Sequence, residues 1–244
     1  MPEGAAEAGT VERRLAALCD QLRSEDAAWM RKLLAHPDTA RLFSAISGEM
    51  FAAGDTARSM AIAGAERGEG RTSFAVLVAA MAAAMEPARR VLLVDADVER
   101  GRLGELFGLD PQARGLADLF EGQPPDPVAF AHATVLPNLF VVPAARPGQR
   151  VIAFNALAFA ELLDRAREQF GFVVVDTPAA AENKAVLSIA KAAGSTLLVV
   201  SYGGPTREQV GRLVDDLRRS GTTLVGCVMN RREYVVPTLF YGEH

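Results

Sequence analysis

The chain has 244 residues, of which 50% are hydrophobic and 23% are charged, and its formal net charge is −4. This length favours one large domain, and the composition excludes a disordered chain. The negative charge argues against nucleic-acid binding, and two distant cysteines with three scattered histidines argue against a disulfide framework or a Cys/His metal site.

The predicted elements begin with a tail over residues 1–10, a helix over 11–34, a second helix over 39–51 and a turn at 54–55. Short apolar strands then alternate with helices, which is typical of an α/β parallel sheet covered on both faces. The expected strands are 59–64, 91–95, 138–142, 172–176, 196–201 and 223–229, and the expected helices are 71–86, 102–108, 113–121, 151–169, 183–193 and 205–220. Residues 123–127 and 143–149 are predicted loops. The predicted organisation is a helical lead-in, 1–55, and one nucleotide-binding domain, 56–244.

The lead-in carries Leu15, Leu18, Leu22 and Trp29 at helical spacing. We expect this apolar stripe to pack on the helical layer of the sheet, with docking of a partner as the alternative. Acidic residues dilute its positive charge, which disfavours a membrane-surface anchor. The first 14 residues lack a signal-peptide core, and the longest uncharged run, 72–85, is shorter than the roughly 20 residues of a spanning helix. We therefore expect a cytoplasmic protein.

A glycine-containing loop, 65–73, joins the strand 59–64 to the helix 71–86. Such a strand–loop–helix segment can turn backbone N–H groups and a helix N-terminus toward phosphate oxygens. Against the template G-x-x-x-x-G-K-[ST], it reads A-x-x-x-x-G-R-T and differs at Ala65 and Arg71. The alternative is an ordinary glycine turn before a core helix.

Carboxylates follow two of the predicted strands. Asp95 and Asp97 leave the strand 91–95 two residues apart, and Asp176 ends the strand 172–176. Ligands of parallel α/β sheets bind at the carboxyl ends of the strands, where buried acids and phosphates together suit magnesium. Each aspartate alone could instead cap a turn, but the order of the three segments is more specific than any one of them.

The ordered motifs resemble the P-loop domain of the bacterial tyrosine kinases (BY-kinases) that control capsule and exopolysaccharide synthesis, within the wider MinD and ParA group of deviant-Walker ATPases. The resemblance covers roughly residues 37–233. The matching segments are G-E-G-R-T-S at 68–73, V-L-L-V-D-A-D-V-E-R at 91–100, L-F-G-L at 106–109 with G-L-A-D-L at 115–119, N-L-F-V-V-P at 138–143, D-T-P at 176–178 and G-C-V-M-N at 226–230. The resemblance implies a P-loop NTPase-type sheet.

The resemblance also implies the role of each site residue. ATP would be wrapped by Gly68, Glu69, Gly70, Arg71, Thr72 and Ser73, and Asn230 would contact its adenine. Mg²⁺ would be held directly by Thr72 and through water by Asp95 and Asp176. Asp97 would be the catalytic base, which takes the proton from the attacking hydroxyl, and Arg71 would contact the transferred phosphate.

Several positions depart from the family pattern. Arg71 stands where the family has lysine, and with no lysine between Lys32 and Lys184 it would have to make the cationic phosphate contact by itself. Glu66 replaces the second lysine of MinD and ParA proteins, and Gly194 replaces a family aspartate. The helix 39–51 lacks the arginine pattern that forms kinase rings, and the tail 231–244 holds just two tyrosines, at 234 and 241.

The first hypothesis is therefore an ATP-dependent tyrosine kinase or ATPase that regulates exopolysaccharide synthesis and export. The alternatives are a nucleotide-binding pseudokinase that acts as a regulator or scaffold, and a MinD/ParA-like positioning ATPase. The resemblance implies a membrane-embedded polysaccharide co-polymerase as activating partner, through which the protein would lie at the inner membrane. It also implies a homo-oligomer, either a dimer or a ring.

Overall fold

The structure is a computed structural model that describes residues 3–22, 28–32, 58–149, 153–231. The helix predicted over 39–51, the turn at 54–55 and the tyrosines of the C-terminal tail lie outside these described residues. No helix within them is long and apolar enough to span a membrane.

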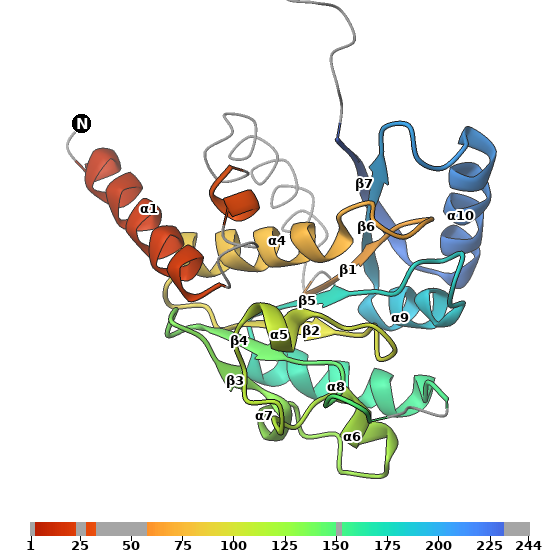
Figure 1. The fold of residues 1–244 in the computed structure, drawn as a ribbon, viewed down its shortest axis with the longest axis horizontal. Coiled ribbons are helices and arrows are strands. Elements are labelled where there is room, and N and C mark those ends of the chain that lie inside the picture. The colour runs from red at the N-terminus through yellow and green to blue at the C-terminus, as the bar shows by residue number, and fades with distance from the viewer. Residues whose placement is uncertain (1–2, 23–27, 33–57, 150–152, 232–244) are drawn as a thin grey trace, which may run out of the picture.

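A seven-stranded sheet in the order β3-β4-β2-β5-β1-β6-β7 forms the centre of the molecule (Figure 1). Its strands are β1 (Ser59–Ala63), β2 (Val91–Asp95), β3 (His132–Ala133), β4 (Leu139–Val142), β5 (Phe172–Asp176), β6 (Ser195–Ser201) and β7 (Thr223–Asn230). All neighbouring strands pair in parallel except β3, which is antiparallel to β4. The predicted parallel α/β sheet is thus confirmed. The two-residue edge strand β3 was not predicted, since it is too short to show an alternating pattern.

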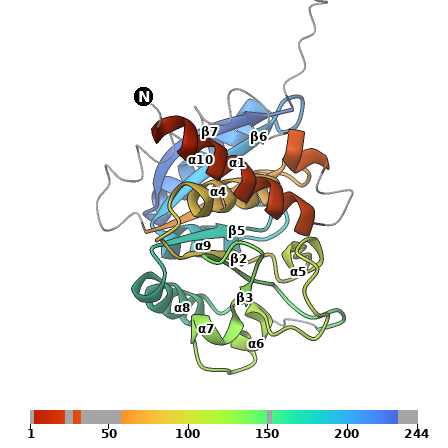
Figure 2. The ribbon, with the colours of Figure 1, turned by 90° about the vertical axis from the view of Figure 1, so that its left-hand side faces the viewer.

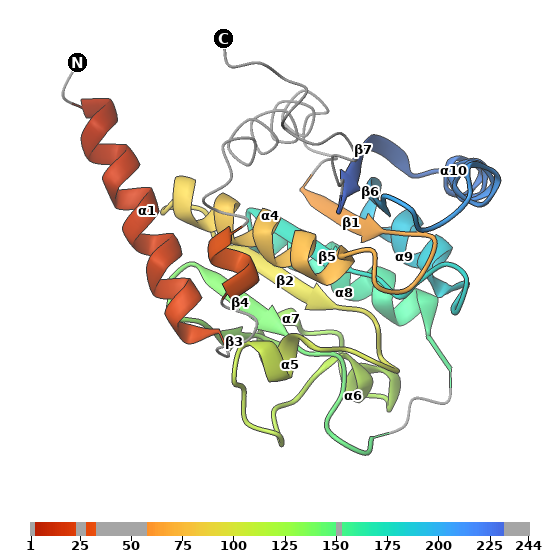
Figure 3. The ribbon, with the colours of Figure 1, turned by 45° about the horizontal axis from the view of Figure 1, so that its top comes forward.

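Helices cover both faces of the sheet (Figures 2 and 3). Successive side chains of a strand point to opposite faces of the sheet, so the hydrophobic core has two parts. Met60 and Ile62 of β1 pack with α1 and α4 on one face, whereas Ala61 and Ala63 pack with α8, α9 and α10 on the other. The helices are α1 (Glu3–Gln21), α4 (Arg71–Met85), α5 (Leu103–Leu106), α6 (Leu116–Phe120), α7 (Pro127–Phe130), α8 (Ala156–Gln169), α9 (Ala185–Ala193) and α10 (Arg207–Ser220). Strands buried on both sides explain why the sequence shows continuous apolar runs.

Local capping explains where the helices differ from prediction. The predicted loop 123–127 ends in the helix α7, because Asp126 accepts a hydrogen bond from the N–H of Val128 at 3.1 Å and Pro127 suits the first helical position. Helix α8 begins later than predicted, because Asn155 caps it by accepting from the N–H of Ala158. Gly194, with φ of 78°, ends α9 and donates its N–H to the carbonyls of Ala190 and Lys191.

Helix α1 packs on α4, as expected for the apolar stripe (Figure 3). Leu15, Leu18 and Leu22 are buried in the shared core, and Arg14 donates to the side-chain oxygen of Asn138 at 2.5 Å. The prediction of a tail over residues 1–10 was wrong, because α1 begins at Glu3. The alanine-rich start of the chain has high helix propensity, which favours this longer helix.

Candidate functional site

The loop after β1 forms one wall of the candidate site, at the carboxyl edge of the sheet. Gly68 and Gly70 adopt φ of 81° and 97°, conformations that glycine takes without steric cost. Gly70 also caps α4, whose first turn receives no hydrogen bond from a side-chain cap. The unpaired N–H groups and the positive end of this helix therefore face the loop, which is the arrangement that binds phosphate.

The side chains of Glu69 and Asn230 form hydrogen bonds that stabilise the conformation of the loop after β1. The carboxylate of Glu69 is 1% exposed and accepts a hydrogen bond from the N–H of Glu66 at 2.8 Å, while its other oxygen is buried with no partner among the described residues. Burial raises the pKa of Glu69. The amide of Asn230, at the end of β7, donates to the carbonyl of Glu69 at 2.8 Å. A Cβ on Gly70 would lie 2.3 Å from that amide nitrogen, so only glycine fits beneath Asn230.

Asp95 and Asp176 lie side by side because they are register partners on the neighbouring strands β2 and β5. Both are buried, and burial raises the pKa of each: to about 7 for Asp176, and well above its ordinary value for Asp95, where the charge of Asp176 adds to the effect. The two oxygens of Asp95 accept backbone N–H groups from Asp97 at 3.2 Å and Leu103 at 2.9 Å. Asp95 therefore also shapes the loop that follows β2.

Thr72 and Asp176 form the pair best suited to hold magnesium. The hydroxyl of Thr72 donates to Asp176 at 2.6 Å, and the second oxygen of Asp176 is buried without a partner among the described residues. A cation would satisfy that oxygen and offset the cost of the buried charge. No group of three or more His, Cys, Asp or Glu residues suited to a metal occurs in the described part of the chain. Mg²⁺ is commonly held by one or two carboxylates together with substrate phosphates, so Thr72 and Asp176 fit a site that the nucleotide completes.

Asp97 and Arg71 both line the same cavity. Burial raises the pKa of Asp97, and the positive charge of Arg71 partly opposes that rise. One oxygen of Asp97 accepts from the N–H of Arg100 at 3.2 Å. The guanidinium of Arg71 donates to the carbonyl of Glu66 at 2.8 Å, and its Nε is buried with no partner among the described residues. Arg71 is thus folded against its own loop.

A cavity of about 250 Å³ lies between the loop, the segment after β2 and the end of β5, and we call it the phosphate cavity. Most of the predicted site residues line it: Gly68, Gly70, Arg71, Thr72, Ser73, Asp97 and Asp176. Glu69, Asp95 and Asn230 support this wall from behind, as described above.

Four further arginines, for which the sequence predicted no role, also line the phosphate cavity: Arg67, Arg100, Arg102 and Arg231. Arg100 forms an ion pair with Glu182 at 2.7 Å. Arg231 follows Asn230 with φ of 56°, the one positive φ outside glycine in the described residues. The phosphate cavity therefore has arginines besides Arg71 in its lining, because loops distant in sequence meet at this edge.

No family model matches the chain. It is 25% identical to tyrosine-protein kinase CpsD of Streptococcus agalactiae over 87% of this chain and 91% of CpsD. It is 30% identical to the succinoglycan biosynthesis transport protein ExoP of Rhizobium meliloti over 74% of this chain, but that match spans only 23% of ExoP.

Solved structures share the fold. The kinase domain of the Escherichia coli tyrosine kinase ETK matches with a TM-score of 0.63 and 23% identity, over 77% of this chain and 74% of that domain. The septum site-determining protein MinD from Pyrococcus horikoshii, complexed with Mg-ADP, matches with a TM-score of 0.61 and 21% identity, over 74% of both chains. The chain is therefore similar in sequence to a tyrosine-protein kinase and to a succinoglycan transport protein, and it shares the P-loop fold of the ETK kinase domain and of MinD.

Proposed function

We propose that this chain binds ATP with Mg²⁺ in the phosphate cavity and transfers the γ-phosphoryl group to a tyrosine hydroxyl, or to water. One observation carries the proposal: the Thr72–Asp176 pair lies at the start of α4, in the same cavity as Asp97. In this proposal a cation site, a phosphate-binding helix end and a base would lie beside one another. The similarity to the succinoglycan biosynthesis transport protein ExoP supports a role in exopolysaccharide synthesis and export.

Each residue has a physical task in this reaction. The N–H groups of the loop and the cavity arginines bind the phosphate oxygens, while Thr72 and Asp176 hold Mg²⁺. When bound, the metal neutralises charge on the phosphates. Asp97 accepts the proton of the attacking hydroxyl, and its raised pKa makes it a better base than an ordinary aspartate. Asn230 keeps Glu69 and Gly70 in place and borders the position proposed for adenine.

A second candidate function rests on Arg71. Because its guanidinium bonds the carbonyl of Glu66, Arg71 is held to its own loop and would reach the γ-phosphate only with its remaining N–H donors. That geometry favours a nucleotide-binding regulator or scaffold with little turnover. A positioning ATPase of the MinD/ParA type has less support, since Glu66 carries no positive charge and accepts a hydrogen bond from Gln209 at 2.8 Å.

ATP hydrolysis and phosphotyrosine formation should be measured for the wild type, Asp97→Ala and Arg71→Lys. We expect both activities to fall at least about 100-fold in Asp97→Ala, the range for a general base, with ATP affinity retained. A wild type that binds ATP yet shows no more activity than Asp97→Ala would overturn the kinase proposal. Activity that appears only in Arg71→Lys would establish the regulator instead.

We also propose that a membrane-embedded polysaccharide co-polymerase is the activating partner and brings the chain to the inner membrane. The similarity to the succinoglycan biosynthesis transport protein ExoP supports this partner. The assays above therefore include a parallel set with the cytoplasmic segment of that partner, and size measurements with and without ATP test for a dimer or ring.

A further inference from the structure

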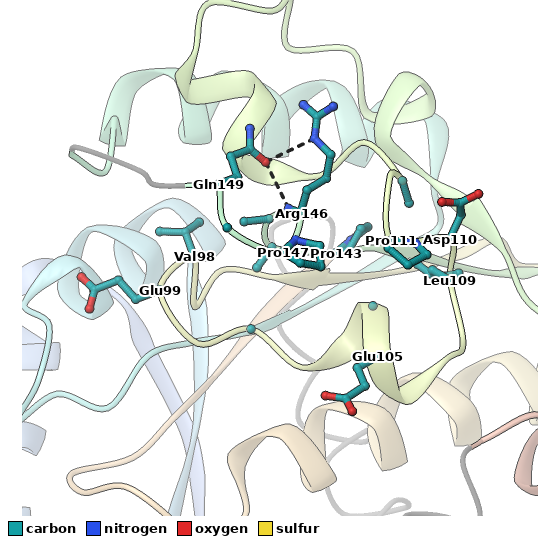
Figure 4. A pocket seen from close by; sticks show the side chains of 16 residues that line it. Val98, Glu99, Glu105, Leu109, Asp110, Pro111, Pro143, Arg146, Pro147 and Gln149 are labelled. Atoms are coloured by element: carbon teal, nitrogen blue, oxygen red, sulfur yellow. Dashed lines mark hydrogen bonds between the residues drawn. The ribbon is translucent and has the colours of Figure 1, made fainter.

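A second cavity of about 420 Å³ lies next to the phosphate cavity (Figure 4). We call it the proline cavity, because Pro111, Pro143 and Pro147 line it together with Leu109 and Val98. Its walls come from the segments after β2 and after β4. None of the site residues predicted from the sequence lines it, and neither ATP nor Mg²⁺ requires it.

Most of the charged residues that line the proline cavity are acidic. Glu99 and Asp110 lie at opposite ends of the lining in Figure 4, and Glu105 of α5 lies below it. The one arginine of the lining, Arg146, is paired with the carboxylate of Asp118, which is 4% exposed and also accepts the N–H of Gly115. Because a buried anion compensates Arg146, Glu99 and Asp110 leave the cavity with negative charge. This cavity disfavours phosphate and favours a cationic ligand with apolar surface.

The two cavities are opposite sides of one loop, residues 97–102. Asp97, Arg100 and Arg102 line the phosphate cavity, whereas Val98 and Glu99 line the proline cavity. Gly101 lines both. A Cβ on Gly101 would lie 2.2 Å from the Cβ of Ala144 and 2.6 Å from Asp95, so Gly101 packs closely against both residues where the two linings meet. A ligand in the proline cavity would therefore lie against the same loop that carries Asp97 into the phosphate cavity.

We propose that the proline cavity binds the peptide segment that carries the acceptor tyrosine, and that it selects segments with lysine or arginine close to that tyrosine. Proline and leucine side chains offer flat apolar surface to an extended peptide, and Glu99 and Asp110 pair with its basic side chains. This inference rests on the proposed kinase function, because it assigns the acceptor site of the same reaction.

Binding and catalysis should be measured separately. The probes are two fluorescein-labelled peptides of equal length around one tyrosine, one with flanking arginines and one with flanking glutamates, titrated by fluorescence anisotropy at low salt. We expect the basic peptide to bind at least about tenfold more tightly. The double variant Glu99→Gln/Asp110→Asn keeps hydrogen-bonding side chains but removes both charges, and should weaken basic-peptide binding about three- to tenfold, in line with exposed ion pairs.

Ala145→Trp tests the cavity itself, because the large side chain would fill space between the proline walls. It should abolish peptide binding while a fluorescent ATP analogue binds with unchanged affinity. Glu208→Gln, on the distant helix α10, is the matched control and should alter neither. In a turnover assay, the double variant should raise KM for the basic peptide and leave kcat unchanged.

Three results would overturn the acceptor-site proposal: equal affinity for both peptides, no effect of the double variant, or full peptide binding in Ala145→Trp. Peptide binding is measured without ATP, so it does not depend on turnover. If the peptide binds as expected but no phosphotyrosine forms, the acceptor site stands as a peptide-binding site and the kinase function fails. If phosphotyrosine forms while the cavity variants behave as wild type, the kinase function stands and the cavity assignment fails.

Discussion

Replacing Asp176 by asparagine should stabilise the nucleotide-free protein at pH 8. Asparagine keeps an oxygen that accepts the 2.6 Å hydrogen bond of Thr72 but removes a charge that is 2% exposed. Burial raises the pKa of Asp176 from 3.8 to about 7, so the folded state binds more protons than the unfolded state between these values. The free energy of unfolding of the wild type therefore falls as pH rises through this window, and stays lower above pH 7.

The size of this effect follows from the two pKa values. At about 1.4 kcal/mol per pH unit, the cost of ionising Asp176 is on the order of 4 kcal/mol, of which about 3 kcal/mol arises between pH 5 and pH 8. For a chain of this length, about 2–4 °C of Tm per kcal/mol predicts that Asp176→Asn gains about 6 °C or more over the wild type across that range.

Thermal unfolding of both proteins, in buffers from pH 5 to pH 8 without metal or nucleotide, measures this difference. Adding Mg²⁺ with ATP at pH 8 should raise the Tm of the wild type but leave the variant almost unchanged, because its cation site is lost. Asp164→Asn, an exposed carboxylate on α8, serves as control and should follow the wild type. If the Tm values of wild type and Asp176→Asn change in parallel from pH 5 to pH 8, the buried carboxylate is not the source of the cost.

Two further predictions concern the loop and the lead-in helix. Asn230→Ala removes the 2.8 Å hydrogen bond to the carbonyl of Glu69 and should weaken binding of a fluorescent ATP analogue about three- to tenfold; unchanged affinity would show that the loop keeps its shape without Asn230. Leu18→Ala empties a fully buried position between α1 and α4 and should lower the free energy of unfolding by about 2–5 kcal/mol in urea titrations, with ATP affinity unchanged. A wild-type unfolding midpoint in Leu18→Ala would mean that α1 does not pack on α4 in solution.

The sheet could be read from the sequence because each parallel strand is a short apolar run followed by a helix. The predicted strand 91–95 agrees with β2 residue for residue, and 172–176 agrees with β5. Those strand ends also located Asp95 and Asp176, since register pairing puts the ends of neighbouring strands together. Short elements such as β3 and α7 were missed, because a tertiary contact or a single cap decides whether they form.

The surroundings of the site were harder to predict than its motifs. Arg67 and Arg231 lie far apart in sequence, and nothing in their local pattern shows that both line one cavity. The buried position of Glu69 was also not evident, because the sequence gives its place in the loop but not the direction of its side chain. The proline cavity depends on loops after two different strands, which only the three-dimensional arrangement brings together.

The scarcity of lysine has a different meaning once these neighbours are known. Five arginines line the phosphate cavity, against the carboxylates of Asp97, Asp176 and Glu182. The positive charge that triphosphate requires is therefore present whichever cation occupies position 71. What Arg71 changes is geometry, because its planar guanidinium is bonded to the carbonyl of Glu66 and a flexible lysine ammonium would not be held in the same way. The variant Arg71→Lys keeps the positive charge at position 71 and changes the geometry of the side chain. Unchanged ATP affinity with altered turnover would show that position 71 controls where the γ-phosphate lies rather than whether ATP binds.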